Sequence, residues 1–185
     1  MRRKRDQTVR PATLRLIRVR TAAGSRTRGW LSAGALRIPV ALGRGGIKAD
    51  KREGDGATPA GRFRLKSLWW RADRGLRPRT LLPVLRIGPQ DAWSEDPADR
   101  NYNRHVRRPP GAAGDRLMRQ DHLYDLIIAL DHNTRPRIAR RGSAVFVHIA
   151  RPGYGPTAGC VAMKSDSLRL LLSRLDPWTQ IDIRS

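Results

Sequence analysis

The segment between Ala144 and Met163 is the part of the sequence that most constrains the fold. In it an apolar run ends at His148, a loop rich in glycine and proline follows, and the only cysteine, Cys160, comes directly after Gly159. An apolar run bounded by turn residues predicts a buried strand. Because side chains alternate along a strand, its two faces are expected to be Ala144, Phe146 and His148 on one side and Val145, Val147 and Ile149 on the other. We expect the loop to return Cys160 to His148 at the end of this strand.

A cysteine close to a histidine is a residue pair used in nucleophilic catalysis. The thiolate is the reactive form of cysteine, and a neighbouring imidazole lowers the thiol pKa or accepts its proton. Gly159 permits unusual backbone angles, and the amides of Gly159 and Cys160 are predicted to stabilise an oxyanion. The residues alone leave a second interpretation open, in which Cys160 is an inert buried side chain and His148 a structural histidine.

Two motifs in a fixed order carry a resemblance to a known family. The first is Val147-His148, then a loop and Thr157-Ala158-Gly159-Cys160-Val161-Ala162-Met163. The second, further towards the amino terminus, is Thr58-Pro59-Ala60-Gly61-Arg62-Phe63. Together they resemble the YkuD-type L,D-transpeptidase catalytic domain, whose members are cysteine enzymes that remodel bacterial peptidoglycan. The resemblance covers about residues 33–183.

The resemblance implies a role for each residue of the first motif. Cys160 would be the nucleophile and His148 the base, oriented by the main-chain carbonyl of Ile149, while Gly159 helps to stabilise the oxyanion. The substrate would be the bond between diaminopimelate and D-Ala in a peptidoglycan stem peptide. Transfer of the acyl group to an amine would make a cross-link, and transfer to water would make the protein an L,D-carboxypeptidase. Neither a metal nor another cofactor is implied, and the location would be the periplasm or cell envelope.

Two positions depart from the family pattern beside the nucleophile. Ala158 stands where most relatives have histidine, and Ala162 stands where most have arginine. The loop between His148 and Cys160 is also shorter than usual. These changes leave nucleophile and base intact, but they leave open which acceptor the enzyme uses. The residues expected to contact substrate are Thr58, Gly61, Trp93, Tyr102, His132, Thr157 and Ala158.

Residues 67–121 are the least regular part of the chain and resemble an insertion found in a subgroup of the family. A long loop with aromatic side chains inside a domain is usually a lid or a binding loop. Trp93 and Tyr102 are therefore candidates for stacking on sugar rings or lining a groove, and the alternative is that they fasten the loop to the body. His132 follows an apolar strand predicted over residues 123–130, where it either contacts substrate or caps a turn. For His105 and His122 we predict no catalytic partner.

The chain as a whole predicts a mainly β fold. Many short strands separated by turn signals indicate a sandwich-like or partly closed sheet, and the family resemblance implies the same, a β-sandwich with a cleft at one end. One helix is expected after the cysteine, because leucines recur at the i, i+3, i+4, i+7 spacing of a single helix face: Leu168, Leu171, Leu172 and Leu175. The length of 185 residues predicts a single domain over residues 13–185, preceded by a basic, flexible tail over residues 1–12.

The charge of the chain suggests a competing class of function. There are 38 Lys and Arg against 16 Asp and Glu, a net charge of +22, and residues 1–30 hold ten basic residues and one acidic residue. Such a charge attracts nucleic acid, anionic lipid or an anionic wall polymer. We interpret attraction to polyanions as a weak consequence, because aromatic residues are only 5% of the chain and it contains no recognisable nucleic-acid-binding motif.

Other classes of protein fit the sequence poorly. A single cysteine and four widely spaced histidines provide no credible set of zinc ligands. No apolar stretch is long enough to cross a membrane. The sequence does not predict an oligomeric state.

Overall fold

The computed structural model describes residues 12–185. The predicted basic tail over residues 1–12 lies outside this part of the chain except for Ala12. The prediction of one domain over residues 13–185 stays a prediction. One observation bears on it, because the strands at the two ends of the described chain, β1 (Leu16–Thr21) and β14 (Gln180–Arg184), are parallel neighbours.

The main sheet is closed on itself. Its strand order is β11-β12-β13-β3-β2-β1-β14-β6-β7, and β6 also pairs with β11. Closure depends on β6, a ten-residue strand whose first half pairs with β14 and whose second half pairs with β11 and β7. The remaining strands of the main sheet are β2 (Arg28–Ala33), β3 (Leu36–Ala41), β6 (Gly61–Trp70), β7 (Val84–Arg86), β11 (Leu126–Leu130), β12 (Phe146–Ile149) and β13 (Val161–Met163). The predicted mainly β class, with a helix after the cysteine, is confirmed.

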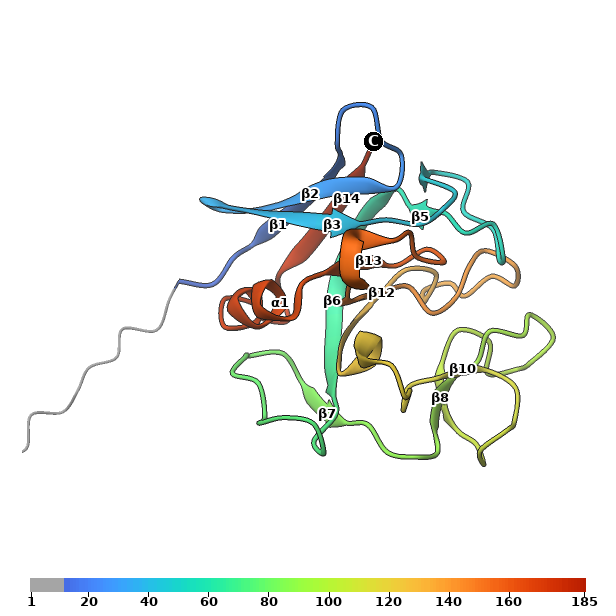
Figure 1. The fold of residues 1–185 in the computed structure, drawn as a ribbon. Coiled ribbons are helices and arrows are strands. Elements are labelled where there is room, and N and C mark those ends of the chain that lie inside the picture. Colours follow the sequence, from blue (N-terminus) through green and yellow to red (C-terminus); the bar gives the residue numbers. More distant parts are fainter. Residues whose placement is uncertain (1–11) are drawn as a thin grey trace, which may run out of the picture.

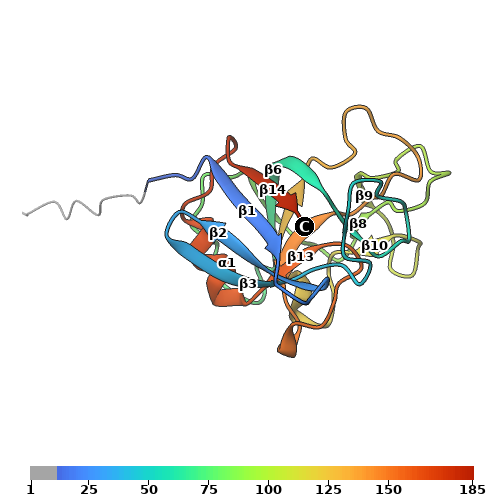
Figure 2. The same ribbon diagram turned by 90° about the horizontal axis from the view of Figure 1, so that it is seen from above.

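Shorter elements lie outside this sheet. A three-stranded sheet has the order β10-β8-β9, and a two-stranded sheet pairs β4 with β5. In Figures 1 and 2 the strands β8 and β10 lie away from β1, β2 and β3. The bounds are β4 (Ile47–Lys48), β5 (Thr58–Pro59), β8 (Asp91–Trp93), β9 (His105–Arg107), β10 (Asp115–Arg116), the 3-10 turns η1 (His122–Tyr124) and η2 (Pro152–Tyr154), and α1 (Ser165–Leu172).

The interior of the closed sheet holds the larger hydrophobic core. Val145 and Val147 belong to this core and Ile149 packs against it, whereas Ala144 and Phe146 belong to a second cluster together with Cys160. The predicted alternation is therefore confirmed for β12, which begins only at Phe146; Ala144 and Val145 precede the strand, and Ala144 has a positive φ of +51°. Leu168, Leu171 and Leu172 of the predicted helix face are fully buried in the larger core, so that α1 packs against the interior of the sheet. The helix ends at Leu172, so Leu175, predicted on the same face, is buried in this core from the segment that follows the helix. Within the described residues, no helix is long and apolar enough to span a bilayer.

The inserted segment covers part of the sheet's outer face. Ile127 and Phe146 point outward from β11 and β12, and they pack with Leu117 of the insertion and with Leu123 of the turn η1 that follows it. The two histidines for which no catalytic partner is predicted each bond a carboxylate. His105 bonds the Asp91 carboxylate at 2.9 Å and stacks on Trp69, and His122 bonds the Asp125 carboxylate at 2.7 Å.

One predicted strand begins later than expected. The apolar run over residues 123–130 starts with the turn η1, whose amino end is capped by the Asp121 side chain, and β11 begins only at Leu126. An Asx cap on the Leu123 amide favours a turn over an extended start. The first two apolar residues of the run therefore face the insertion, and only the later ones belong to the closed sheet.

Two neighbouring leucines of α1 test the core assignment. Leu171 is fully buried, whereas Leu170 is 54% exposed. We expect Leu171→Ala to lower the free energy of unfolding by roughly 2–5 kcal/mol, because it leaves a cavity. Leu170→Ala should change it by less than about 0.5 kcal/mol. Urea unfolding followed by circular dichroism measures both, and equal effects would contradict the burial of this face.

Candidate active site

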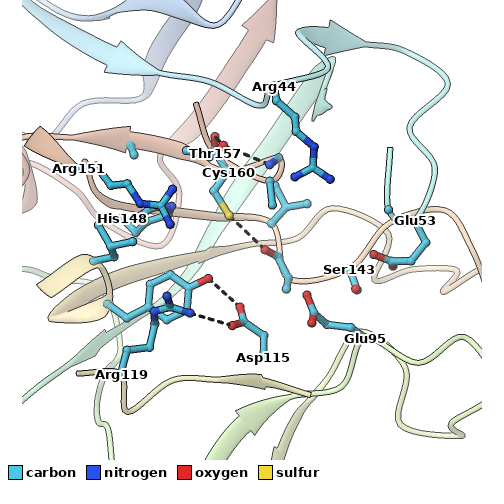
Figure 3. A pocket seen from close by; sticks show the side chains of 18 of the residues that line it. Arg44, Glu53, Glu95, Asp115, Arg119, Ser143, His148, Arg151, Thr157 and Cys160 are labelled. Carbon is cyan, nitrogen blue, oxygen red and sulfur yellow. Dashed lines mark hydrogen bonds and ion pairs between the residues drawn. The ribbon is translucent and has the colours of Figure 1, made fainter. Parts of the chain in front are cut away.

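Two neighbouring parallel strands bring the predicted histidine and cysteine together. β12 and β13 pair with His148 opposite Ala162. Cys160 immediately precedes β13, and it shares the outer face of the sheet with Phe146 and His148. Cys160 and His148 both line one cavity of about 490 Å³, which Figure 3 shows from close by. This size is within the range of cavities that bind small molecules and peptides.

Backbone groups of the preceding segment hold the thiol of Cys160. Its Sγ atom donates to the Ala144 carbonyl oxygen at 3.3 Å and accepts from the Phe146 amide at 3.4 Å. The residue is 7% exposed. Burial raises the pKa of the Cys160 thiol to about 12, because a thiolate would lose its hydration there. The sulfur is therefore protonated at neutral pH.

The carbonyl of the next residue holds the imidazole of His148. Nδ1 lies 2.9 Å from the Ile149 carbonyl oxygen, which is the contact predicted for Ile149. A carbonyl oxygen can only accept, so Nδ1 carries the proton of the neutral ring and Nε2 presents a lone pair. Burial lowers the pKa of His148 to about 4. The ring is therefore neutral at pH 7, in the tautomer that a general base at Nε2 requires.

Thiol and imidazole are both neutral in this arrangement. Within residues 12–185 no hydrogen bond joins Sγ to the ring, because the thiol proton is donated to Ala144. With thiol and imidazole pKa values of about 12 and about 4, the neutral forms are strongly favoured over thiolate and imidazolium. Nucleophilic chemistry here requires the thiol to turn away from Ala144 and to pass its proton to Nε2 as the sulfur attacks.

The inserted segment positions the carbonyl that holds the thiol. Ala144 has φ +51°, a left-handed conformation that is unfavourable for a residue with a Cβ atom. The Asn103 side chain stabilises it, because its Oδ1 accepts from the Ala144 amide at 3.2 Å and from Trp93 Nε1 at 3.0 Å. Its Nδ2 donates to the carbonyls of His132 and Asn133. Asn103 therefore joins the insertion to the segment that precedes β12.

Two threonine hydroxyls support the loop at the nucleophile. Thr157 Oγ1 donates to the Cys160 carbonyl at 2.7 Å and accepts from the Gly159 amide at 3.1 Å. Thr58 Oγ1 accepts from the Gly43 amide at 2.8 Å and faces the Cys160 carbonyl at 3.5 Å. The Gly159 amide, predicted as an oxyanion donor, is thus already engaged. The Cys160 amide has no acceptor among residues 12–185.

A close backbone approach requires glycine at position 159. Gly159 has φ +144°, and a Cβ atom there would lie 2.8 Å from the Ala57 carbonyl oxygen. That distance is shorter than a van der Waals contact, and the opposing atom belongs to backbone that cannot rotate away. The loop can therefore run this close to the segment around Ala57 only without a side chain at this position.

Five residues predicted to contact substrate do not line the cavity, and their role in binding stays a prediction. Thr58 is fully buried behind the loop. Gly61 begins β6 and pairs with Ile183. Trp93 packs edge-on against Phe146. The other two, Tyr102 and His132, also have partners away from the cavity.

Tyr102 and His132 are held by other parts of the structure. Tyr102 is 3% exposed, and its hydroxyl donates to the Glu53 carboxylate. It therefore fastens the insertion to the body, which is the alternative considered for it and for Trp93. His132 bonds the Arg141 carbonyl at 3.0 Å, and its ring packs edge-on against Phe63. Of the predicted substrate contacts, only Thr157 and Ala158 line the cavity.

The insertion and the turn η1 that follows it supply a wall of the cavity that the sequence did not predict. The Tyr124 ring lies edge-on to the His148 ring, with centroids 5.3 Å apart. Its hydroxyl donates to the Asp115 carboxylate at 2.7 Å, and Arg119 lies over the Tyr124 ring. Burial raises the pKa of the Asp115 carboxyl and that of the Tyr124 hydroxyl. Tyr124 was assigned to a strand, and nothing in the local pattern connected Asp115 or Arg119 with residues about 30 to 40 positions away.

Charged side chains of both signs complete the lining of the cavity. Arg44, Arg119 and Arg151 provide positive charge, and Glu53, Glu95 and Asp115 provide negative charge. Lys51 also lines the cavity, but its ammonium group is paired with Asp55 at 2.6 Å. Among residues 12–185, no three histidine, cysteine or acidic side chains are grouped so that they could hold a metal ion.

Comparison with known families agrees with this geometry. The model of the L,D-transpeptidase catalytic domain, YkuD, matches residues 15–183. The match covers nearly the whole chain, from the first strand to the last and including the inserted segment. A comparison with curated proteins finds no match.

The raised thiol pKa predicts slow alkylation at neutral pH. Only the thiolate reacts, so the rate constant of Cys160 with iodoacetamide should rise about tenfold per pH unit between about pH 7 and pH 10, without a plateau. Mass spectrometry of the modified fraction against time measures it. The urea-unfolded protein is the control, in which the rate should level off above about pH 8.5. A plateau below pH 8 in the folded protein would indicate a thiolate–imidazolium pair at rest.

Two glycines of the loop provide a matched test of the close approach. We expect Gly159→Ala to lower the free energy of unfolding by roughly 3 kcal/mol, because strain and a backbone clash add. Gly153 also has a positive φ, +75°, but nothing lies within 4 Å of a Cβ atom there. Gly153→Ala should therefore lower it by only about 1 kcal/mol. Urea unfolding measures both, and effects of equal size would argue against the clash.

Proposed function

The chain belongs to the L,D-transpeptidase catalytic domain family, YkuD, and from this premise we propose that it is a cysteine acyltransferase acting on peptidoglycan stem peptides. Proteins of this family act on the peptides of the bacterial cell wall. The observation that carries the proposal is that the only thiol of the chain and a neutral imidazole with a free Nε2 line the same cavity. The place of action is accordingly the periplasm or cell envelope.

The first half-reaction forms a thioester. Sγ of Cys160 attacks the carbonyl carbon of the diaminopimelate residue that precedes the terminal D-Ala, and the thiol proton passes to Nε2 of His148. The carbon–nitrogen bond then breaks, and His148 returns the proton to the leaving amine. The products are an acyl-enzyme and free D-Ala. The hydrogen bond from Nδ1 to Ile149 keeps the ring oriented throughout and stabilises its charged form.

The second half-reaction releases the acyl group. An amine of another stem peptide attacks the thioester, Nε2 accepts its proton, and the thiol re-forms as the new amide bond is made. If water attacks instead, the product is a free carboxylate and the protein is an L,D-carboxypeptidase. Ala158 and Ala162 both line the cavity and contribute only methyl groups beside the thiol. The acceptor site there is therefore shaped differently from that of relatives with histidine and arginine.

Both half-reactions pass through a tetrahedral oxyanion that needs hydrogen-bond donors. The Cys160 amide is the donor that this geometry leaves available, and an amide aimed at a developing negative charge contributes a large share of catalysis in such sites. The Gly159 amide can join it only if its bond to Thr157 breaks. The Thr157 hydroxyl fixes the Cys160 carbonyl, and through it the direction of the peptide plane that follows.

The reaction is tested with muropeptides that carry tetrapeptide stems. Wild-type protein should release D-Ala and form dimers, both followed by liquid chromatography with mass spectrometry. Cys160→Ala should abolish both activities, and His148→Gln should lower the rate of D-Ala release by roughly 10²–10⁴-fold, the usual contribution of a general base.

A second histidine provides the control for this test. His122 is exposed and does not line the cavity, so His122→Gln should leave the rate of D-Ala release unchanged within about twofold. D-Ala release without dimers would identify a carboxypeptidase. No release from any muropeptide, together with tight salt-sensitive binding to DNA, would overturn the proposed enzyme in favour of a polyanion-binding protein.

A further inference from the structure

The cavity has a second end, away from His148, with its own set of polar groups. Along the chain, Ser143 lies just before Ala144, which holds the thiol, and His148 lies beyond Phe146 on the other side. Figure 3 shows the same order in space, with His148 and Arg151 on one side of the sulfur and Ser143, Glu53 and Glu95 on the other. The end at Ser143 has no role in the proton transfers described above.

A buried hydroxyl at this end has no partner. Ser143 is 8% exposed, and its Oγ atom makes no hydrogen bond among residues 12–185. Burying a hydroxyl without a partner is unfavourable, so an unpaired group of this kind calls for a partner such as a water molecule, an ion or a ligand. Because Ser143 lines the cavity, a polar group of a ligand placed there would supply the missing hydrogen bond.

Two opposite charges at this end are also unpaired. Within the described part of the chain, the side chains of Arg44 and Glu95 form neither a hydrogen bond nor an ion pair, with each other or with another residue. Glu95 is exposed as a residue, yet its carboxylate faces the cavity. Loss of hydration, and then the nearby charges of Asp115 and Glu53, raise the pKa of Glu95 to about 7. A cation placed beside Glu95 would favour its ionised form.

Arg44 and Glu53 are held in place by hydrogen bonds to neighbouring segments. The Arg44 amide donates to the Thr157 carbonyl at 2.9 Å. Glu53 accepts from the Tyr102 hydroxyl, so its carboxylate is fixed beside the cavity. A ligand that carries both an anion and a cation could therefore bridge Arg44 and the two glutamates without moving the backbone.

We propose that this end of the cavity is a subsite for the zwitterionic amino-acid group at the end of the acyl donor's diamino-acid side chain, with its carboxylate on Arg44 and its ammonium on Glu95, Glu53 and Ser143. The proposal rests on the proposed function, because the acyl carbon of that residue must lie at Cys160. An extended side chain then leads away from the reacting carbonyl to the end opposite His148.

Reaction chemistry assigns the subsite to the donor and not to the acceptor. An attacking amine must be neutral and must give its proton to Nε2 of His148, so it approaches from the histidine side. An amine held by the carboxylates of Glu95 and Glu53 stays protonated and has no lone pair for attack. The same argument places the leaving D-Ala, which takes its proton from His148, at the end where Arg151 lies.

The test measures binding separately from turnover. Three tetrapeptide stems differ only in their third residue: meso-diaminopimelate, its form acetylated on the side-chain amine, and lysine, which lacks the side-chain carboxylate. Titration calorimetry with Cys160→Ala protein gives the Kd of each. Glu95→Gln, added to Cys160→Ala, should raise the Kd of the diaminopimelate and lysine stems by about tenfold and leave that of the acetylated stem unchanged. Arg44→Gln should weaken both diaminopimelate stems about tenfold and leave the lysine stem unchanged.

Two exposed residues of α1 provide charge-matched controls. Asp166 and Arg169 do not line the cavity, so Asp166→Asn and Arg169→Gln should leave all three Kd values unchanged. The subsite would be overturned if Glu95→Gln raised the Kd of all three stems equally or changed none of them. It would also be overturned if no stem bound at all.

The outcomes separate this proposal from the proposed function. If the binding pattern is found but wild-type protein releases no D-Ala, the enzyme assignment fails and the subsite stands. If D-Ala is released from all three stems with the same kcat/KM, and Glu95→Gln has no effect, the subsite fails and the enzyme assignment stands.

Discussion

The parallel pairing of β12 with β13 is the constraint on which the site depends. It sets His148 opposite Ala162 and so places Cys160, two residues earlier, on the same outward face of a closed sheet. Two strands joined in parallel need a connection that travels back along their length, and the loop between His148 and Cys160 makes this return with the help of the turn η2. The same pairing sends the valines of β12 into the interior. Burial of the valines therefore fixes the register of β12. A slip of one residue would expose the valines and turn the His148 imidazole into the core.

The inserted segment turns an exposed sheet face into an enclosed cavity. Without it, the outward side chains of β11 and β12 would meet solvent, and the thiol would have an ordinary aqueous environment. Leu117 of the insertion covers that face together with Leu123 and Tyr124 of the turn η1 that follows it, and Asn103 fixes the segment whose Ala144 carbonyl accepts the thiol proton. The burial that keeps both reactive groups neutral is thus supplied in part by a segment with little regular structure of its own. Glu95 and Asp115, two of the acidic side chains that line the cavity, come from the same segment.

Features with a regular period along the chain were predicted from the sequence, whereas contacts between residues far apart in the sequence were not. Strand alternation around Phe146 and the leucine spacing of α1 depend on periods of two and 3.6 residues, which a single sequence displays directly. The pairing of His148 with Ile149 followed from a motif. By contrast, Thr58 belongs to a recognisable motif, and only the fold reveals that its hydroxyl supports the back of the Cys160 loop. No sequence signal identified Tyr124 or Asp115. They matter because Tyr124 bonds Asp115 and packs against His148 of β12, a strand far along the chain.

The hydrogen bond from the thiol to Ala144 has a consequence for the chemical durability of the protein. Peroxides and other oxidants attack thiolates far faster than thiols, and the oxidation products beyond sulfenic acid are not reversed in most settings. A sulfur that keeps its proton until an acyl carbon arrives is shielded from that damage, even in an oxidising compartment where no second cysteine of this chain could form a disulfide with it. The arrangement makes the resting thiol a weaker nucleophile, and in return it protects the only thiol of the chain from oxidation.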